Sequence, residues 1–337
     1  MRGGKLVEGS APGKVILFGE HAVVYGKLAV ATAIDVRSHC MVEPWPAGSG
    51  LVRLQDYNVE FEVPAREPGS GDDGSEQGFA GLLAFLDNFQ RRRGASLAGL
   101  RATIWSELPP AMGLGSSASV LAALAVTLSA CHELDLGLEQ LREDVLAGER
   151  RFHGKPSGID HALCLAGGTH SFEAGRLSPL HASSKAGQLD LLVVSSGVPR
   201  QTANMVAKVA RLREREPGTF ERVVDRIDAV AREGARALEM GDLQEVGRLM
   251  YENHELLVEL GVSHPTLDGL VNICREAGAL GAKLTGGGGG GCVVVACAPG
   301  TEEAVERRLV ERGFRHFAAS ADAPGARATV GADREVA

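Results

Sequence analysis

A glycine-bearing loop at residues 109–118, Pro-Pro-Ala-Met-Gly-Leu-Gly-Ser-Ser-Ala, constrains the fold of this 337-residue chain more than any other segment. Residues 100–106 alternate apolar and polar side chains as a strand does, two prolines end the alternation, and an alanine- and leucine-rich run follows Ser119. This order predicts a strand, a glycine loop and the first turn of a helix. The unpaired N–H groups of a first turn and the positive end of the helix dipole attract anions, so we expect an anion site here.

The loop by itself is compatible with several kinds of site. It is not a Walker A motif, because no lysine follows its second glycine. Residues 113–118 fit the dinucleotide fingerprint G-x-G-x-x-G/A, but the acids that would bind the ribose, Glu133 and Asp135, lie at the end of a helix-like run and not of a strand. The loop alone therefore leaves open a nucleotide or phosphate site, a tight turn without a ligand, and a dinucleotide site.

The length of the chain suits two domains better than one. Composition turns small and polar around residues 182–189, and a boundary there gives domains 1–187 and 188–337. The first half mixes strand-like and helix-like segments, whereas the second half carries three long helical patterns between residues 220 and 277. A sheet is predicted to pack on those helices, built from residues 189–195, 292–298 and a tail strand near Arg327–Val330.

Charge and cysteine usage exclude several classes of protein. The 35 Lys and Arg residues are outnumbered by 43 Asp and Glu, and the net charge of −8 argues against nucleic acid or an anionic membrane as the main partner. The six cysteines are dispersed without a C-x-x-C pair, which leaves metal clusters and redox motifs unsupported. The longest apolar run, residues 120–131, is too short to span a bilayer. We expect a soluble, cytoplasmic protein.

Two further segments carry polar residues that a core does not need. In residues 11–26, an apolar strand begins with Lys14 and ends in Gly19-Glu20-His21. A lysine can stabilise a developing alkoxide or phosphate charge, and a Glu-His pair can bind a polar substrate. The other interpretation is an edge strand with solvated ends.

The third segment is a run of six glycines, residues 286–291, placed directly before the strand-like residues 292–295. Each glycine in regular structure costs about 0.5 to 1 kcal/mol relative to alanine. A flexible linker is the alternative, but a linker is not flanked at once by a β-branched core strand. The run therefore predicts close packing of backbone against a ligand or another loop.

Together these segments resemble the three signature motifs of the small-molecule kinase superfamily named for galactokinase, homoserine kinase, mevalonate kinase and phosphomevalonate kinase. Within the superfamily the resemblance is strongest to the mevalonate kinases, and it extends over nearly the whole chain. Four stretches carry this narrower resemblance, at residues 11–26, 148–162, 198–202 and 261–268.

The resemblance implies an α+β fold of two domains, an N-terminal one like the second domain of ribosomal protein S5 and a C-terminal ferredoxin-like one, with ATP between them. It implies phosphorylation of the C5 hydroxyl of (R)-mevalonate, an early step of isoprenoid precursor synthesis, and it allows a homodimer. The alternative within the superfamily is a kinase for phosphomevalonate, galactose or homoserine, against which the stretches around His21 and Thr202 argue. A binding protein without catalysis is disfavoured because Lys14, Glu149 and Asp160 are all present.

The resemblance also assigns roles residue by residue. Asp160 matches the catalytic aspartate, Lys14 its charge partner, and Ser117 with Glu149 the ligands of Mg²⁺, an ion that prefers oxygen donors and bound phosphates. A base and a cation of this kind suit the transfer of a phosphoryl group to an alcohol. The residues expected around ATP are Asn58, Ser106, Ala111, Met112, Gly113, Leu114, Gly115, Ser116 and Ser117, and those expected around the substrate are Glu20, His21 and Thr202.

Three residues depart from the pattern of the family. Met112 stands where alanine or glycine is usual, so we expect a slightly different shape of the phosphate loop. Gly287 replaces an alanine common in the third motif, which predicts added flexibility. His161 follows the catalytic aspartate where a small polar residue is frequent, and we expect it to alter the pH dependence.

Overall fold

Two long antiparallel strands, β1 (Val7–Phe18) and β2 (Ala29–Pro44), form the centre of the first sheet in the computed structural model, which describes residues 6–46, 48–63, 79–109, 112–153, 157–181 and 189–331. The sheet has the order β12-β1-β2-β5-β3-β4, with β6 paired to β2 and β7 to β6. The remaining strands are β3 (Gly50–Leu54), β4 (Val59–Val63), β5 (Leu100–Ser106), β6 (Thr169–Glu173), β7 (Arg176–Pro179) and β12 (Arg327–Val330).

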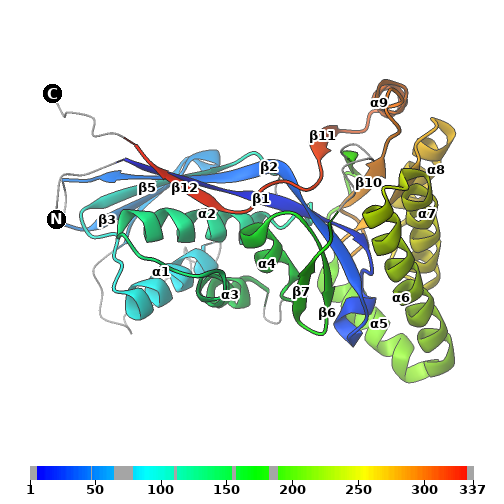
Figure 1. The fold of residues 1–337 in the computed structure, drawn as a ribbon, viewed down its shortest axis with the longest axis horizontal. Coiled ribbons are helices and arrows are strands. Elements are labelled where there is room, and N and C mark those ends of the chain that lie inside the picture. Colours follow the sequence, from blue (N-terminus) through cyan, green and yellow to red (C-terminus); the bar gives the residue numbers. More distant parts are fainter. Residues whose placement is uncertain are drawn as a thin grey trace.

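Helices cover one face of this sheet, as Figure 1 shows for α2, which runs along β1 and β2. Helix α2 is apolar on nearly all sides because it lies between the sheet and the other helices. Its Ser119 hydroxyl donates a hydrogen bond of 2.8 Å to the carbonyl of Ala11, which fixes α2 against β1. The helices of this layer are α1 (Ala80–Arg93), α2 (Ser116–Cys131), α3 (Leu138–His153) and α4 (Ile159–Ala166).

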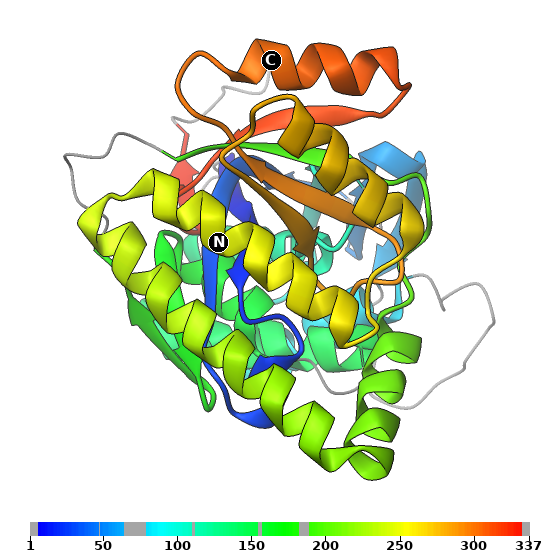
Figure 2. The same cartoon turned by 90° about the vertical axis from the view of Figure 1, so that its right-hand side faces the viewer.

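The second sheet is antiparallel, with the order β11-β8-β10-β9. Helices α7 and α8 pack on β9, and α6 lies beside α7 (Figures 1 and 2). The strands are β8 (Asp190–Ser195), β9 (Gly281–Thr285), β10 (Cys292–Ala296) and β11 (His316–Ser320); the helices are α5 (Thr202–Arg215), α6 (Pro217–Met240), α7 (Leu243–Glu259), α8 (Pro265–Glu276) and α9 (Glu302–Glu311). The predicted α+β fold is confirmed.

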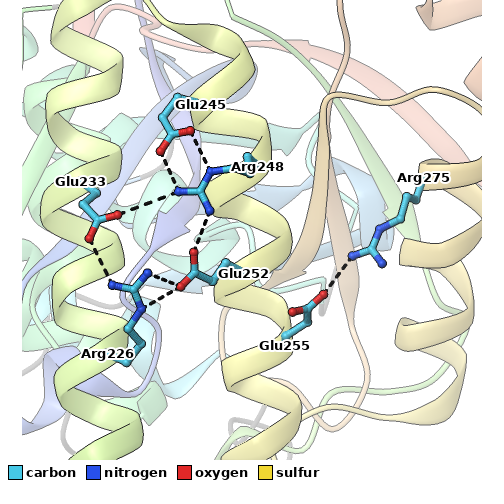
Figure 3. A network of polar contacts seen from close by, with 7 residues as sticks. All are labelled: Arg226, Glu233, Glu245, Arg248, Glu252, Glu255 and Arg275. Atoms are coloured by element: carbon cyan, nitrogen blue, oxygen red, sulfur yellow. Dashed lines mark hydrogen bonds and ion pairs between the residues drawn. The ribbon is translucent and has the colours of Figure 1, made fainter.

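The exposed side of α6, α7 and α8 carries alternating charges (Figure 3). Arg248 pairs with Glu252 at 3.0 Å and with Glu245 at 2.7 Å, and Arg226 pairs with Glu233 at 3.2 Å. Such pairs between exposed side chains contribute little to stability. The hydrophobic packing beneath them holds the helices together.

One hydrophobic core is shared by the two sheets. It includes Val15 and Phe18 from β1 together with Ile227 from α6 and Val293 from β10. None of the helices in the described ranges is long and apolar enough to cross a membrane. The two halves of the chain are therefore packed together, while the boundary at residues 187 and 188 lies outside the described residues and stays a prediction.

The tail strand was predicted to join the second sheet, and this prediction is wrong. β12 pairs antiparallel with β1 in the first sheet, with Val330 opposite Val7. The preceding residues are held there by Arg37, whose guanidinium donates to the carbonyls of Pro324 at 2.8 Å and Gly325 at 2.9 Å. The tail returns because β1 has a free edge whose backbone groups need partners.

The contact between α6 and β1 leads to a testable prediction on two helical glycines. A Cβ at Gly234 of α6 would overlap the ring of the fully buried Phe18, whereas a Cβ at the exposed Gly269 of α8 would meet no atom within 4 Å. Gly234→Ala should destabilise the protein by about 1 to 3 kcal/mol. Gly269→Ala should stabilise it by up to about 1 kcal/mol through helix propensity. Thermal or urea unfolding measures both, and equal effects would contradict the packing described.

Candidate active site

The glycine loop has the strand-loop-helix arrangement predicted for it. β5 ends at Ser106, and α2 begins at Ser116 with Gly115 as its N-cap. Gly113 and Gly115 have φ angles of 83° and 75°, which favour glycine. The free N–H groups of the first turn of α2 therefore face the loop. Ala111, expected to contact ATP, lies outside the described residues.

Lys14 joins the first motif to this loop. Its Nζ lies 3.1 Å from Oδ1 of Asp160 and donates a hydrogen bond of 3.0 Å to the carbonyl of Gly113. Its backbone N–H donates to the carbonyl of Leu114 at 2.9 Å. The lysine side chain is 3% exposed and that of Asp160 33%, so the cation is buried behind a carboxylate that reaches the surface. The expected pairing of Lys14 with Asp160 is present.

Asp160 comes from the first turn of α4, which Gly158 caps with a φ of 93°. That turn places the carboxylate at the positive end of the helix dipole, which favours an anion. The neighbouring Cys164 is buried one turn further along, with its Sγ 3.9 Å from the carbonyl of Gly115. Helix α4 therefore packs against the phosphate loop, and Asp160 faces the same space as the loop.

Glu149 of α3 is buried beside Ser117 of α2. Burial raises the pKa of Glu149 to about 7; the charge of Asp160 adds to this effect, and the Ser117 hydrogen bond opposes it. Its Oε1 has no hydrogen-bond partner among the residues that the structure describes. An orphaned carboxylate oxygen beside a hydroxyl suits a cation with oxygen ligands.

A cation held here would need further ligands. Within the described ranges, no group of three or more His, Cys, Asp or Glu side chains could hold a metal ion. Magnesium usually takes one or two protein oxygens and completes its shell with water and phosphate oxygens. The pair Ser117 and Glu149 therefore fits Mg²⁺ bound together with a nucleotide.

The six-glycine run lies against the phosphate loop. A Cβ on Gly286 would be 3.8 Å from the carbonyl of Gly113, and one on Gly291 would be 3.7 Å from that of Met112. A Cβ on Gly290 would be 2.5 Å from the carbonyl of Pro199, closer than a real Cβ can approach. The prediction of close packing is confirmed, and the run is not a linker.

The residues expected around the substrate separate into two groups. His21, with a φ of 61°, places Nε2 3.0 Å from the carbonyl of Gly287, and Thr202 stands exposed beside Gly287 at the start of α5. Glu20 is instead 1% exposed, and both of its carboxylate oxygens are engaged, one with Lys283 and one with Asn253 at 3.2 Å. The structure therefore gives Glu20 an internal partner and does not support it as a substrate ligand.

Two residues expected near the nucleoside are brought together. The backbone N–H of Ser106 donates to the carboxylate of Asp56 at 2.7 Å, and Asp56 belongs to the turn that Asn58 ends with a φ of 51°. The hydroxyl of Ser106 also lies 2.8 Å from that of Ser38. These contacts bring the turn that Asn58 ends next to the end of β5, where the segment that leads to the phosphate loop begins.

Sequence reasoning missed two cations of the site. Lys283 is fully buried in β9, and a lysine at the start of a glycine-rich motif, within an apolar strand, was the available sign. Arg200 lies in the stretch 198–202 that carried the family resemblance, but no role was assigned to it. Its guanidinium is aimed at Gly113, with Nη1 3.6 Å from the place of a Cβ on that glycine.

Two of the three departures from the family pattern have a structural explanation. A Cβ on Gly287 would lie 2.5 Å from Oγ1 of Thr202, so glycine here makes room for a side chain. Met112 is partly buried against the shared hydrophobic core, which anchors the loop. Burial lowers the pKa of His161 to about 4, so the ring is uncharged near neutral pH, and the expected effect on pH dependence stays a prediction for more acidic conditions.

The comparisons with known proteins agree with this geometry. Residues 81–168 match the GHMP kinases N terminal domain, and residues 231–315 match the family GHMP kinases C terminal. The chain is 34% identical to the mevalonate kinase of Aeropyrum pernix, over 94% of this chain and 97% of that protein. It is also 34% identical to the mevalonate kinase of Homo sapiens, over 94% of this chain and 93% of that protein.

Two solved structures are similar over nearly their whole length. The Methanococcus jannaschii mevalonate kinase has a TM-score of 0.84 and 28% identity, with 95% of this chain and 99% of that chain covered. The L. major mevalonate kinase in complex with R-mevalonate has a TM-score of 0.79 and 29% identity, with 96% of this chain and 97% of that chain covered.

The buried His161 predicts a measurable pH dependence of stability. Its pKa falls from 6.5 to about 4, chiefly through burial; the charges of Arg142 and Arg150 add to the effect, and those of Asp160 and Glu139 oppose it. Between these values the unfolded chain binds the proton more tightly, so the free energy of unfolding decreases as pH falls. His161→Asn removes this titration. Between pH 6.5 and 4, the free energy of unfolding of the variant should therefore decrease by on the order of 2 kcal/mol less than that of wild type. Urea unfolding of both proteins at several pH values tests this prediction. An equal decrease in the free energy of unfolding of the two proteins would contradict it.

Proposed function

Because this chain belongs to the GHMP kinase family, and within it to the mevalonate kinases, we propose that it transfers the γ-phosphoryl group of ATP to the C5 hydroxyl of (R)-mevalonate. The products are ADP and 5-phosphomevalonate, and the reaction is an early step of isoprenoid precursor synthesis. The Lys14–Asp160 ion pair at the phosphate loop, with 3.1 Å between Nζ and Oδ1, carries this proposal.

The residues of the ion pair divide the chemistry between them. Asp160 is the part of the pair that reaches the surface, so it accepts the proton that leaves the substrate hydroxyl. Lys14 stabilises the negative charge that develops on the attacking oxygen, and its bond to the Gly113 carbonyl keeps it at the loop. Phosphoryl transfer needs mainly positioning of the reactants and neutralisation of charge. The pair supplies a proton acceptor and a positive charge for this reaction.

ATP binds with its phosphates on the loop from Met112 to Ser117, at the N-terminus of α2. Ser117 and Glu149 hold Mg²⁺, which neutralises charge on the β- and γ-phosphates when it is bound. The orphaned Oε1 of Glu149 supports this assignment. Asn58 and Ser106 lie near the nucleoside.

His21 and Thr202 bind the acceptor at the corner formed with Gly287. Burial lowers the pKa of His21, so the neutral ring donates from Nε2 to the Gly287 carbonyl and leaves Nδ1 as an acceptor for a hydroxyl. Glu20 acts indirectly, by holding this corner through Lys283. The other acceptors considered, phosphomevalonate, galactose and homoserine, are not favoured by the relatives found.

Two expectations about the cellular form of the protein stay predictions. The six cysteines are all free thiols, and five of them are buried, which supports a reducing compartment such as the cytoplasm. A homodimer is the assembly that the family resemblance suggested.

The assignment predicts ADP release that depends on (R)-mevalonate. In a coupled assay, the wild-type protein should release ADP with mevalonate and not with galactose, homoserine or phosphomevalonate. Asp160→Asn should keep ATP affinity within about threefold, and its turnover should fall by at least two orders of magnitude, roughly the contribution of a positioned base. Absence of ADP release from wild type would refute the reaction, and near-normal turnover of the variant would remove Asp160 from its role.

A further inference from the structure

Helices α1 and α3 lie side by side below α2 in Figure 1, and a buried ionic contact joins one end of the pair. The carboxylate of Asp144 in α3 is fully buried. One of its oxygens lies 2.8 Å from Nε of Arg93 and the other 3.1 Å from Nη1 of Arg92, both at the end of α1. The Arg93 side chain is only 13% exposed, so this contact belongs to the interior between the two helices.

Glycines hold the other end of the pair. A Cβ on Gly148 of α3 would lie 2.8 Å from the carbonyl oxygen of Gly81 in α1 and 2.6 Å from the side chain of Leu121 in α2. A Cβ on Gly81 would lie 2.2 Å from the ring of Phe152. The two helices are therefore antiparallel. Asp144, Gly148 and Phe152 are four residues apart and form one stripe of α3 that faces α1.

This stripe sets the direction of Glu149. Glu149 follows Gly148 directly, and one residue of an α-helix turns the side chain by about 100°. The turn takes Glu149 away from α1 and toward Ser117 of α2, whose hydroxyl donates a hydrogen bond to its carboxylate. A rotation or a slip of α3 on α1 would therefore move Glu149 relative to Ser117.

The buried charge of Asp144 fixes this register more strictly than apolar packing does. Apolar contacts are non-directional, so they tolerate small displacements of one helix on another. Asp144 keeps both guanidinium partners in one register only, and without them its charge would be buried and uncompensated. Because Mg²⁺ demands near-ideal octahedral geometry, a small displacement of Glu149 weakens metal binding before it disrupts the helix packing.

We propose that Asp144 is a positioning residue, which sets the register of α3 on α1 so that Glu149 and Ser117 together bind the Mg²⁺ of the nucleotide complex. The proposal rests on the Mg²⁺ assignment within the proposed function and not on the identity of the acceptor. Asp144 acts only through Glu149, because its own carboxylate is enclosed between the helices.

Nucleotide binding tests the proposal without an acceptor. By calorimetry, wild type should bind the non-hydrolysable analogue AMP-PNP more tightly with Mg²⁺ than with EDTA. In Asp144→Asn, the affinity with Mg²⁺ should fall by about tenfold, a typical loss when a group that orients a metal ligand is removed, and the affinity in EDTA should change less than about twofold. An unchanged affinity with Mg²⁺, or an equal loss in EDTA, would overturn the proposal.

Kinetics provides a second measurement. In Asp144→Asn, the Mg²⁺ concentration that gives half the maximal rate should rise by about tenfold, and KM for mevalonate should change less than about twofold. A lower melting temperature with an unchanged Mg²⁺ dependence would show a merely structural role and overturn the proposal. If wild type does not phosphorylate mevalonate, the proposed function fails for the acceptor, while the AMP-PNP result still decides on Asp144.

Glu143→Gln is the matched control. It removes one negative charge from the adjacent position of α3, where the exposed Glu143 pairs with the same Arg92. Because exposed pairs contribute little, this variant should keep the Mg²⁺ dependence of wild type. A loss equal to that in Asp144→Asn would show that net charge, and not the register of α3, causes the effect, and would overturn the proposal.

Arg93→Lys tests the same contact from the side of α1 and decides if Asp144→Asn does not fold. Arg93 donates to Asp144 and also, from Nη2, to the carbonyl of Gln140 at 3.3 Å. A lysine keeps the charge but lacks the planar fork that makes both contacts. The variant should bind AMP-PNP more weakly with Mg²⁺ and as well as wild type in EDTA. Wild-type affinity under both conditions would overturn the proposal.

Discussion

The buried ion pair between Glu20 and Lys283 is the interaction on which the rest of the structure depends. Both side chains are almost fully buried, and burial raises the pKa of Glu20 and lowers that of Lys283, so each charge is tolerated only because of the other. Lys283 also donates to the carbonyl of Leu284 at 2.7 Å, and Asn253 donates to Glu20 at 3.2 Å. Loss of one partner would leave an uncompensated charge, at a cost of about 3 to 5 kcal/mol.

This pair fixes the position of the chemistry. It links the residues that follow β1 to β9. A hydrogen bond of 3.0 Å from the N–H of Ile16 to the hydroxyl of Thr285 also holds β1 beside β9. From β9 the chain enters the glycine run, which packs on the phosphate loop. Lys14 lies in β1, two residues before Ile16, and its side chain contacts both the loop and Asp160. Residues far apart in sequence thus meet within one hydrogen-bonded seam between the two sheets.

Much of the local structure could be predicted from sequence. Residues 100–106 were expected as a strand and are β5. The three long helical patterns expected between residues 220 and 277 are α6, α7 and α8. These segments have a clear apolar periodicity that one face of a strand or helix satisfies by itself. The partner of β12 was assigned wrongly, because a short polar strand near a terminus carries no pattern that says which sheet edge it completes. Arg200 was missed because an arginine beside a proline resembles any solvated loop residue.

The sequence by itself determined the motifs, the loop that binds an anion and the residues able to do acid–base and metal chemistry, because these depend on residue types and short spacings. Only the tertiary structure decided which polar groups face a ligand and which face each other. It turned Glu20 inward to Lys283, left Oε1 of Glu149 and the guanidinium of Arg200 without partners in the described chain, and made His161 a neutral core residue. The physical reason is that burial and charge pairing are properties of contacts between distant segments, and these are set by packing rather than by local sequence.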